Sequence, residues 1–321
     1  MSLVTGFRVG GLACHALEAG LQRLDGGAMF GVVPKPLWER RIAADERNRI
    51  PLALRCLLVE HPDGLVLCDT GIGNKEDEKF RDIYAVENAG RSGRTQLEDA
   101  LREAGFSPED VRWVINTHLH FDHCGGNTYV DVGASGRADP RVAGSANDAP
   151  PSHRRPADQS AIRLSFPNAT YVVQRGELEF GMAPHERARA SYLRPNFVPV
   201  TEAGRWRLVR GEIELLPGIR LVPTPGHVPH HQSILLEDRG ERALYLGDLV
   251  PTSAHLPLPW IMGYDLEPLV TLETKRGILA RAEAEGWLLV FEHDPVVPVG
   301  RVVREGKSYA CAPLDTVSRG G

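Results

Sequence analysis

Four side chains that can bind a metal ion lie within six positions of one another in the middle of the chain. The segment Thr117-His118-Leu119-His120-Phe121-Asp122-His123 contains three imidazoles and a carboxylate, directly after an apolar run at 111–116 that predicts a strand. Neutral imidazole nitrogen and carboxylate oxygen are ligands that zinc and similar ions prefer, and a catalytic zinc needs only about three of them from the protein. The segment alone therefore predicts a metal site.

Three further residues of the same chemical kind each follow a short apolar run. They are His227 after LVPTPG, Asp248 after ALYLG and His293 after WLLVFE. Each of them alone is more often a structural residue or part of a turn. Strand ends meet at one edge of a sheet, however, so these residues can join the first four. Seven ligands exceed the needs of one tetrahedral ion and suit two ions that share a bridging carboxylate.

The remaining histidines and the cysteines lack such a context. Hydrogen-bonded structural roles are expected for seven histidines: His15, His61, His153, His185, His230, His231 and His255. The five cysteines are scattered and form no CxxC pair, which predicts neither a disulfide framework nor a thiolate metal site. Cys124 follows a candidate ligand directly, but its side chain is expected to point away from the metal.

The elements that must position these residues are strands followed by helices. Apolar runs at 53–60 and 64–68 flank an Asp63-Gly64 turn and predict an antiparallel pair. Thr95 and Glu98 match a capping box for a helix that ends near Gly105. Strands are expected at 111–116 and 169–174, and polar helix-like sequence continues to about residue 193.

The second half predicts a meander and then alternating elements. Its strands are expected at 206–209, 212–216 and 219–223, with Arg210-Gly211 as a turn, and later at 232–237, 243–246 and 287–291, with a long helix at about 267–285. Residues 131–165 are rich in Gly, Ala, Ser and Pro and predict a flexible surface insertion. The expected architecture is one α/β domain over 1–321, in which mixed sheets are layered with helices.

Composition narrows the class of protein. The 321 residues are 42% hydrophobic, enough for a large core, and 37 basic and 42 acidic side chains give a net charge of -5 without a long run of either sign. This argues against a nucleic-acid partner. No leader-like N-terminus and no stretch of about 20 apolar residues is apparent, so we expect a cytoplasmic protein that acts on a small molecule and has no membrane partner.

The segment His118–His123 reads HxHxDH, and with the later His227, Asp248 and His293 it resembles the metallo-β-lactamase superfamily. Asp69-Thr70-Gly71 after a strand is part of the same likeness, which covers about residues 50–300. The resemblance implies a four-layer αβ/βα sandwich of two mixed β-sheets flanked by helices. It also implies a first metal on His118, His120 and His227, a second on Asp122, His123 and His293, and Asp248 bridging them.

The same resemblance implies a hydrolase in which a hydroxide held between two metal ions attacks an ester, lactone or related bond. Zinc is expected, with manganese or iron as alternatives, and Asp122 or Asp248 would accept a proton as the intermediate collapses. The ligand set is most similar to that of quorum-quenching lactonases and organophosphate or aryl-ester hydrolases. Those lactonases carry a tyrosine three positions after the bridging Asp, where this chain has Pro251. Tyr192 and Tyr264 are the candidates to replace it.

Two apolar segments are candidates for a substrate pocket. One is Met29–Pro34 with Trp38, and the other is Leu256–Met262, in which Trp260 is expected to contact an apolar substrate arm. Either segment could instead pack on the core or form a homodimer contact. The competing functions are an iron-dependent redox enzyme on the same scaffold, a glyoxalase II-like thioester hydrolase, and a non-enzymatic binding protein.

Overall fold

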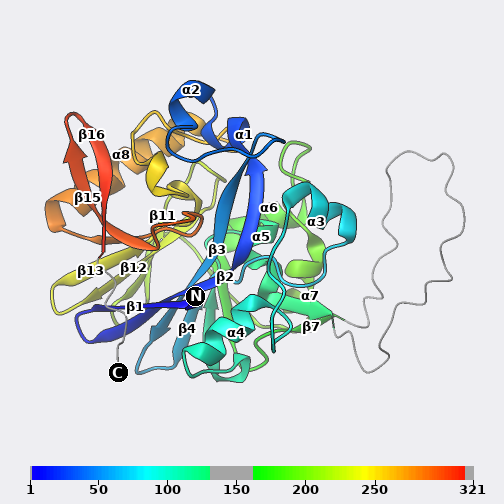
Figure 1. Cartoon of the computed structure of the whole chain (residues 1–321). Coiled ribbons are helices and arrows are strands. Elements are labelled where there is room, and N and C mark those ends of the chain that lie inside the picture. The colour runs from blue at the N-terminus through cyan, green and yellow to red at the C-terminus, as the bar shows by residue number, and fades with distance from the viewer. Residues whose placement is uncertain (1, 131–161, 315–321) are drawn as a thin grey trace, which may run out of the picture.

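Two seven-stranded sheets face each other in the computed structural model, which describes residues 2–130 and 162–314 (Figure 1). The first sheet has the order β1-β2-β3-β4-β5-β8-β9. Its strands from β1 to β4 are antiparallel, and those from β4 to β9 are parallel. The bounds are Val4–Val9 for β1, Leu12–Asp25 for β2, Arg49–Glu60 for β3, Leu65–Cys68 for β4, Val111–Ile115 for β5, Thr170–Gln174 for β8 and Trp206–Val209 for β9.

The second sheet runs β10-β11-β12-β13-β14-β15-β16 and is antiparallel except for the pair β13 and β14. Its strands are β10 (Ile213–Leu216), β11 (Ile219–Pro223), β12 (Gln232–Asp238), β13 (Glu241–Tyr245), β14 (Leu288–Val290), β15 (Val299–Glu305) and β16 (Ser308–Pro313). A separate two-stranded sheet pairs β6 (Thr128–Val130) with β7 (Ile162–Leu164). Both large sheets are therefore mixed, as the sequence predicts.

Alternation along the central strands explains why the sheets are covered on both faces. In β3, Leu57 and Val59 belong to the core between the sheets, whereas Cys56 and Leu58 belong to the core on the outer face of the first sheet. Because successive side chains of a strand point to opposite faces, a strand that is apolar throughout must be buried on both. The second sheet follows the same rule, since alternate residues of β13 pack inward and outward.

Helices form the two outer layers. Side chains of α3, α4 and α7 pack on the outer face of the first sheet, and those of α8 pack on the second. The helices are α1 (Gly26–Phe30), α2 (Lys35–Trp38), α3 (Glu78–Tyr84), α4 (Gln96–Glu103), α5 (Phe121–Cys124), α6 (Arg175–Met182), α7 (Val198–Glu202) and α8 (Pro268–Glu285). Short 3₁₀ turns are η1 (Pro108–Asp110), η2 (Gly125–Asn127), η5 (Arg194–Asn196), η6 (Gly247–Leu249) and η7 (Ser253–His255). The predicted four-layer αβ/βα sandwich is confirmed.

Two local predictions are wrong. Residues 206–223 do not form a meander, because β9 pairs in parallel with β8 in the first sheet while β10 begins the second, so Arg210-Gly211 lies in a crossing between sheets. Thr95 is the N-cap residue of α4, but its side chain makes no capping hydrogen bond. Glu98 turns instead to Arg94, whose backbone N–H it accepts at 2.8 Å.

The predicted insertion at 131–165 lies mostly outside the described residues. Its last residues are described, and 162–164 form strand β7 and pair with β6 rather than continuing a loop. Within the described ranges, no helix is both long and apolar enough to cross a membrane.

Candidate metal centre

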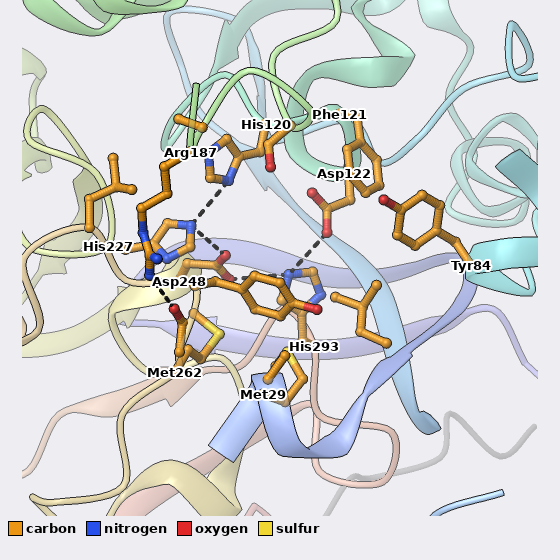
Figure 2. Close-up of a pocket in the computed structure, with 17 residues that line it drawn as sticks. Met29, Tyr84, His120, Phe121, Asp122, Arg187, His227, Asp248, Met262 and His293 are labelled. Atoms are coloured by element: carbon orange, nitrogen blue, oxygen red, sulfur yellow. Dashed lines mark hydrogen bonds and ion pairs between the residues drawn. The ribbon is translucent and has the colours of Figure 1, made fainter. Parts of the chain in front are cut away.

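All seven candidate ligands converge at one edge of the sandwich. Residues 118–123 follow β5 in the first sheet, and the other three follow strands of the second: His227 after β11, Asp248 in η6 after β13, and His293 after β14. Each is at most 9% exposed. Figure 2 shows that His120, Asp122, His227, Asp248 and His293 point toward a common centre. Strand ends of both sheets therefore build the site, as expected.

The seven side chains form two clusters. In the first, ligand atoms of His118, His120, His227 and Asp248 all lie within 4.8 Å of one another. His227 Nε2 lies 3.1 Å from His120 Nδ1 and 3.1 Å from Asp248 Oδ2. Two nitrogens bound at about 2.05 Å by one tetrahedral zinc would be about 3.3 Å apart, so this spacing fits ligands of one ion.

The second cluster contains Asp122, His123 and His293. His293 Nε2 lies 3.3 Å from His123 Nε2 and 3.8 Å from Asp122 Oδ2. Asp248 also faces this cluster, because its Oδ1 lies 3.2 Å from His293 Nε2 while its Oδ2 faces the first cluster. One carboxylate thus lies between two groups of ligands.

The outer nitrogens of the imidazoles show that the inner ones are poised to bind a cation. His227 Nδ1 contacts Asp265 Oδ1 at 2.9 Å, His293 Nδ1 contacts the Ala53 carbonyl at 2.8 Å, and His123 Nδ1 contacts Asp69 Oδ2 at 3.1 Å. A neutral ring that donates from Nδ1 presents a lone pair at Nε2. Facing lone pairs about 3 Å apart repel each other unless a cation lies between them.

His118 supports the same conclusion. Its Nε2 is buried and has no hydrogen-bond partner among the described residues. A buried polar atom without a partner costs roughly 1 to 3 kcal/mol, which a bound cation would remove. Burial, followed by the neighbouring imidazoles, holds the pKa of both His118 and His120 well below the usual range. These two rings are therefore neutral, the form that binds metal.

The carboxylates make the centre favourable for positive charge. Although burial lowers the pKa of His293, the nearby carboxylate of Asp248 raises it to about 9. The pKa of His123 is likewise raised, against burial, by Glu292, Asp248 and Asp122. The same negative charges that favour an imidazolium would favour a divalent ion in its place.

Asp69 holds the motif in position. Thr117 donates its backbone N–H and its hydroxyl to the two Asp69 carboxylate oxygens at 2.8 and 2.7 Å. Asp69 has a φ of 54°, a left-handed conformation that is rare for a residue other than glycine. Strain of this kind collects where the fold must hold a functional group in place, and here that group is the loop containing His118 and His123.

Several supporting residues were missed in the sequence. Asp265 and Glu292 face metal-ligand candidates, the latter with Oε2 at 3.0 Å from His123 Nδ1, and Gln22 Nε2 donates to Asp122 Oδ2. His231 has the hydrogen-bonded structural role expected of it: burial lowers its pKa to about 3, and its Nε2 accepts the backbone N–H of Asp248 at 3.1 Å. A usable signal existed only for Glu292, which directly precedes a ligand.

A cavity of about 400 Å³ opens onto the two clusters. Its apolar lining includes Leu24, Ala28, Met29, Phe121, Ala188, Met262 and Leu266. The lining also includes two phenols, Tyr84 and Tyr264, and one arginine, Arg187. Figure 2 shows Tyr84 on the Asp122 side and Arg187 on the His227 side. A largely apolar pocket with a few polar groups is typical of a small-molecule site.

The structure corrects three predictions about the pocket. Tyr192 does not line it, because its ring packs on His120 and its buried hydroxyl donates to Glu177 Oε1 at 2.8 Å. Trp260 does not line it either, and packs edge-on against Phe30 with 5.7 Å between ring centroids. Of Met29–Pro34, only Met29 reaches the cavity, since Phe30 is buried in the core with Trp38. Tyr264 lines the pocket, and Cys124 lies outside both clusters.

Comparison with known proteins agrees with this geometry. The family model of the metallo-beta-lactamase superfamily matches residues 50–293. The chain belongs to this superfamily. The match contains all seven residues of the two clusters together with Asp69.

Relatives and solved structures indicate which members of the superfamily this chain resembles. The chain is 28% identical over 195 residues to an N-acyl homoserine lactonase of Bacillus cereus, and 27% identical over 205 residues to the N-acyl homoserine lactonase AttM of Rhizobium radiobacter. These alignments cover 59% and 61% of this chain and 60% and 63% of the relatives, so the match spans about three fifths of each protein.

The solved structures cover nearly the whole chain. A probable metal-dependent hydrolase from Staphylococcus aureus superimposes with a TM-score of 0.79 and 28% identity, covering 97% of this chain and 100% of that one. AidC, a dizinc quorum-quenching lactonase solved with a product, gives a TM-score of 0.74 at 19% identity, covering 99% of this chain and 100% of its own. At that identity the likeness to AidC establishes the fold alone.

Proposed function

We propose that this protein is a metal-dependent hydrolase that cleaves an ester or lactone bond in a small molecule with an apolar arm. The observation that carries the proposal is the pair of ligand clusters that share Asp248 at the floor of a largely apolar cavity. The lactonase relatives support the choice of bond, because they are named for lactone cleavage.

We assign His118, His120 and His227 to one ion and Asp122, His123 and His293 to a second, with Asp248 between them. Two divalent ions held this way, such as the zinc that this ligand set suits, would polarise a carbonyl oxygen and lower the pKa of a shared water toward neutrality. The spacing of the inward-facing nitrogens and the neutral rings of His118 and His120 fit this role.

The protein side chains supply orientation and proton transfer. Asp265, Asp69 and the Ala53 carbonyl fix the rings of His227, His123 and His293. Such partners normally contribute 10- to 100-fold to metal affinity or activity. Asp122 and Asp248 line the cavity and are the carboxylates placed to accept a proton as the bond breaks. The apolar wall excludes water and binds the arm of the substrate.

The test is a hydrolysis panel on protein loaded with zinc or manganese. It contains acyl homoserine lactones with short and long arms, aryl esters, a thioester and a phosphotriester. We expect close to two ions per chain by elemental analysis, metal-dependent turnover of lactones or esters, and loss of turnover with a chelator. Iron in the purified protein together with oxygen consumption, or turnover of the thioester alone, would refute this function.

A further inference from the structure

Arg187 is an unusual member of the pocket wall. Among the described residues that line the cavity, the other ionisable groups are metal-ligand candidates or phenols, so Arg187 is the single cation outside the clusters. Its side chain is exposed, and it extends along the His227 side of the pocket (Figure 2). Arg187 is therefore placed where a substrate passes from solvent to the metal ligands.

Most of the hydrogen-bonding capacity of Arg187 is available to a ligand. One terminal nitrogen donates to the Gly263 carbonyl at 2.6 Å, and within residues 2–130 and 162–314 the guanidinium has no carboxylate at ion-pair distance. A guanidinium carries five N–H donors in a planar fork that matches the two oxygens of a carboxylate. The contact with Gly263 fixes the arm of Arg187 and leaves the fork free for recognition.

Charges on the two sides of the pocket mouth differ in sign. Residues 182–196, which contain Arg187, include three arginines and one glutamate. Residues 76–87, which include Tyr84 on the opposite side, contain five acidic and two basic side chains. An anionic group on a substrate would be repelled by the second segment and attracted to the first, which gives the substrate one preferred orientation.

We propose that Arg187 is a specificity-determining residue that binds a carboxylate at the far end of the substrate arm. The substrate class is then an ester or lactone whose apolar arm ends in an anionic group. The apolar wall contacts the arm, and the Arg187 fork binds the carboxylate where the pocket opens. This inference rests on the proposed hydrolase function and adds the chemistry of the arm.

The test compares two substrates of similar shape, one charged and one neutral, after the spontaneous hydrolysis of each has been subtracted. One is the mono-para-nitrophenyl ester of glutaric acid, and the other is the isostere in which an isopropyl group replaces the carboxylate. We expect the zinc-loaded protein to prefer the carboxylate ester by about tenfold in kcat/KM. A bidentate, charge-assisted hydrogen bond between the exposed guanidinium and a carboxylate has about this strength, and added salt should weaken the preference.

Variants assign the preference to Arg187. In Arg187→Gln the preference for the carboxylate ester should disappear because KM for that ester rises, while kcat/KM for the isostere should change less than threefold. Arg187→Lys should retain part of the preference. The matched control is Arg189→Gln, because Arg189 is an exposed arginine of the same segment that pairs with Glu186 and does not line the cavity. Melting temperatures of all variants identify any loss of the folded state.

Equal kcat/KM for the two esters in the parent protein, or a preference that persists in Arg187→Gln, would overturn the assignment of Arg187. Failure to hydrolyse either ester would count against the proposed function instead. In that case, calorimetric binding of the corresponding stable amides still decides the role of Arg187, because the charged amide should bind about tenfold more tightly than its isostere only when Arg187 is present.

Discussion

Replacing Lys275 by methionine tests how the pocket wall is supported. Lys275 lies in α8 with 1% of its surface exposed, and its Nζ donates to backbone carbonyls of the adjoining loop. The four acceptors are the carbonyls of His255, Pro257, Leu258 and Trp260. This loop leads directly into 262–266, the segment that contributes Met262, Tyr264 and Leu266 to the cavity and also contains Asp265. One buried ammonium therefore organises the approach to the site.

The expected loss follows from these contacts. An ammonium has three N–H donors, so methionine leaves at least three inward-facing carbonyls without a donor, at roughly 1 to 3 kcal/mol each if they stay dry. Relaxation and water entry reduce this, and about 3 to 5 kcal/mol is typical when one member of a buried charged network is removed. With an unfolding entropy of about 0.7 kcal/mol/K for a chain of this length, the melting temperature should fall by about 5 to 7 °C.

The assay is urea unfolding followed by tryptophan fluorescence, with Lys307→Met as the control because Lys307 is exposed. Burial lowers the pKa of Lys275 from its ordinary value of 10.5 to about 7. Between those values the unfolded chain binds more protons than the native one, so this lysine makes the protein more stable as the pH rises above 7. The stability difference between parent and Lys275→Met should therefore be larger at pH 9 than at pH 6.5. A decrease in the unfolding free energy of less than about 1 kcal/mol in Lys275→Met would refute the role of the carbonyl contacts. An equal decrease at both pH values would show that Lys275 stays protonated in the folded protein over this pH range.

Three other substitutions test the site and its surroundings. Asp248→Ala should abolish turnover and reduce the metal content while the circular dichroism spectrum stays native, and retained activity would mean that Asp248 is an ordinary turn residue. Asp265→Asn should weaken zinc binding by about 10- to 100-fold in a competitive chelator titration, because the His227 ring loses its carboxylate partner; unchanged affinity would contradict that role. Trp260→Ala should lower the unfolding free energy by about 1 to 3 kcal/mol and leave KM within twofold, because Trp260 packs on Phe30 outside the cavity. A large rise in KM with normal stability would show instead that Trp260 contacts the substrate.

The metal-ligand candidates could be found in the sequence because their signal is local. His118, His120, Asp122 and His123 lie on one short loop, and the other three candidates share a recognisable position after an apolar strand. The strands themselves were predictable for the same reason, since burial on both faces leaves continuous apolar runs. These features depend on neighbours a few residues away.

The residues that escaped prediction owe their roles to distant partners. Gln22 meets Asp122 across a hundred positions, and Arg187 meets Gly263 across 76. The residues that neighbour Gln22 and Arg187 in the sequence give no indication of these contacts. The error at β9 and β10 has a related cause, because a short apolar strand pattern gives no information about which of two sheets the strand joins. Trp260 was misplaced because an apolar loop near a ligand can equally face the cavity or the core, and here Phe30 decides the outcome.

The division of the ligands between the two sheets has a consequence for biosynthesis. Residues 118–123 are translated early, whereas His227, Asp248 and His293 belong to the half that emerges later. Domains generally fold as units from the N-terminal side during synthesis, at about 5 to 20 residues per second. The first half of the chain contains only part of each ligand cluster. At these rates, synthesis of the segments with the remaining ligands takes at least several seconds after the loop containing His118 and His123 has been made. Completion of the ligand clusters is therefore a late step of synthesis, and a ribosome stalled before residue 293 would display a polypeptide that lacks one residue of the second cluster.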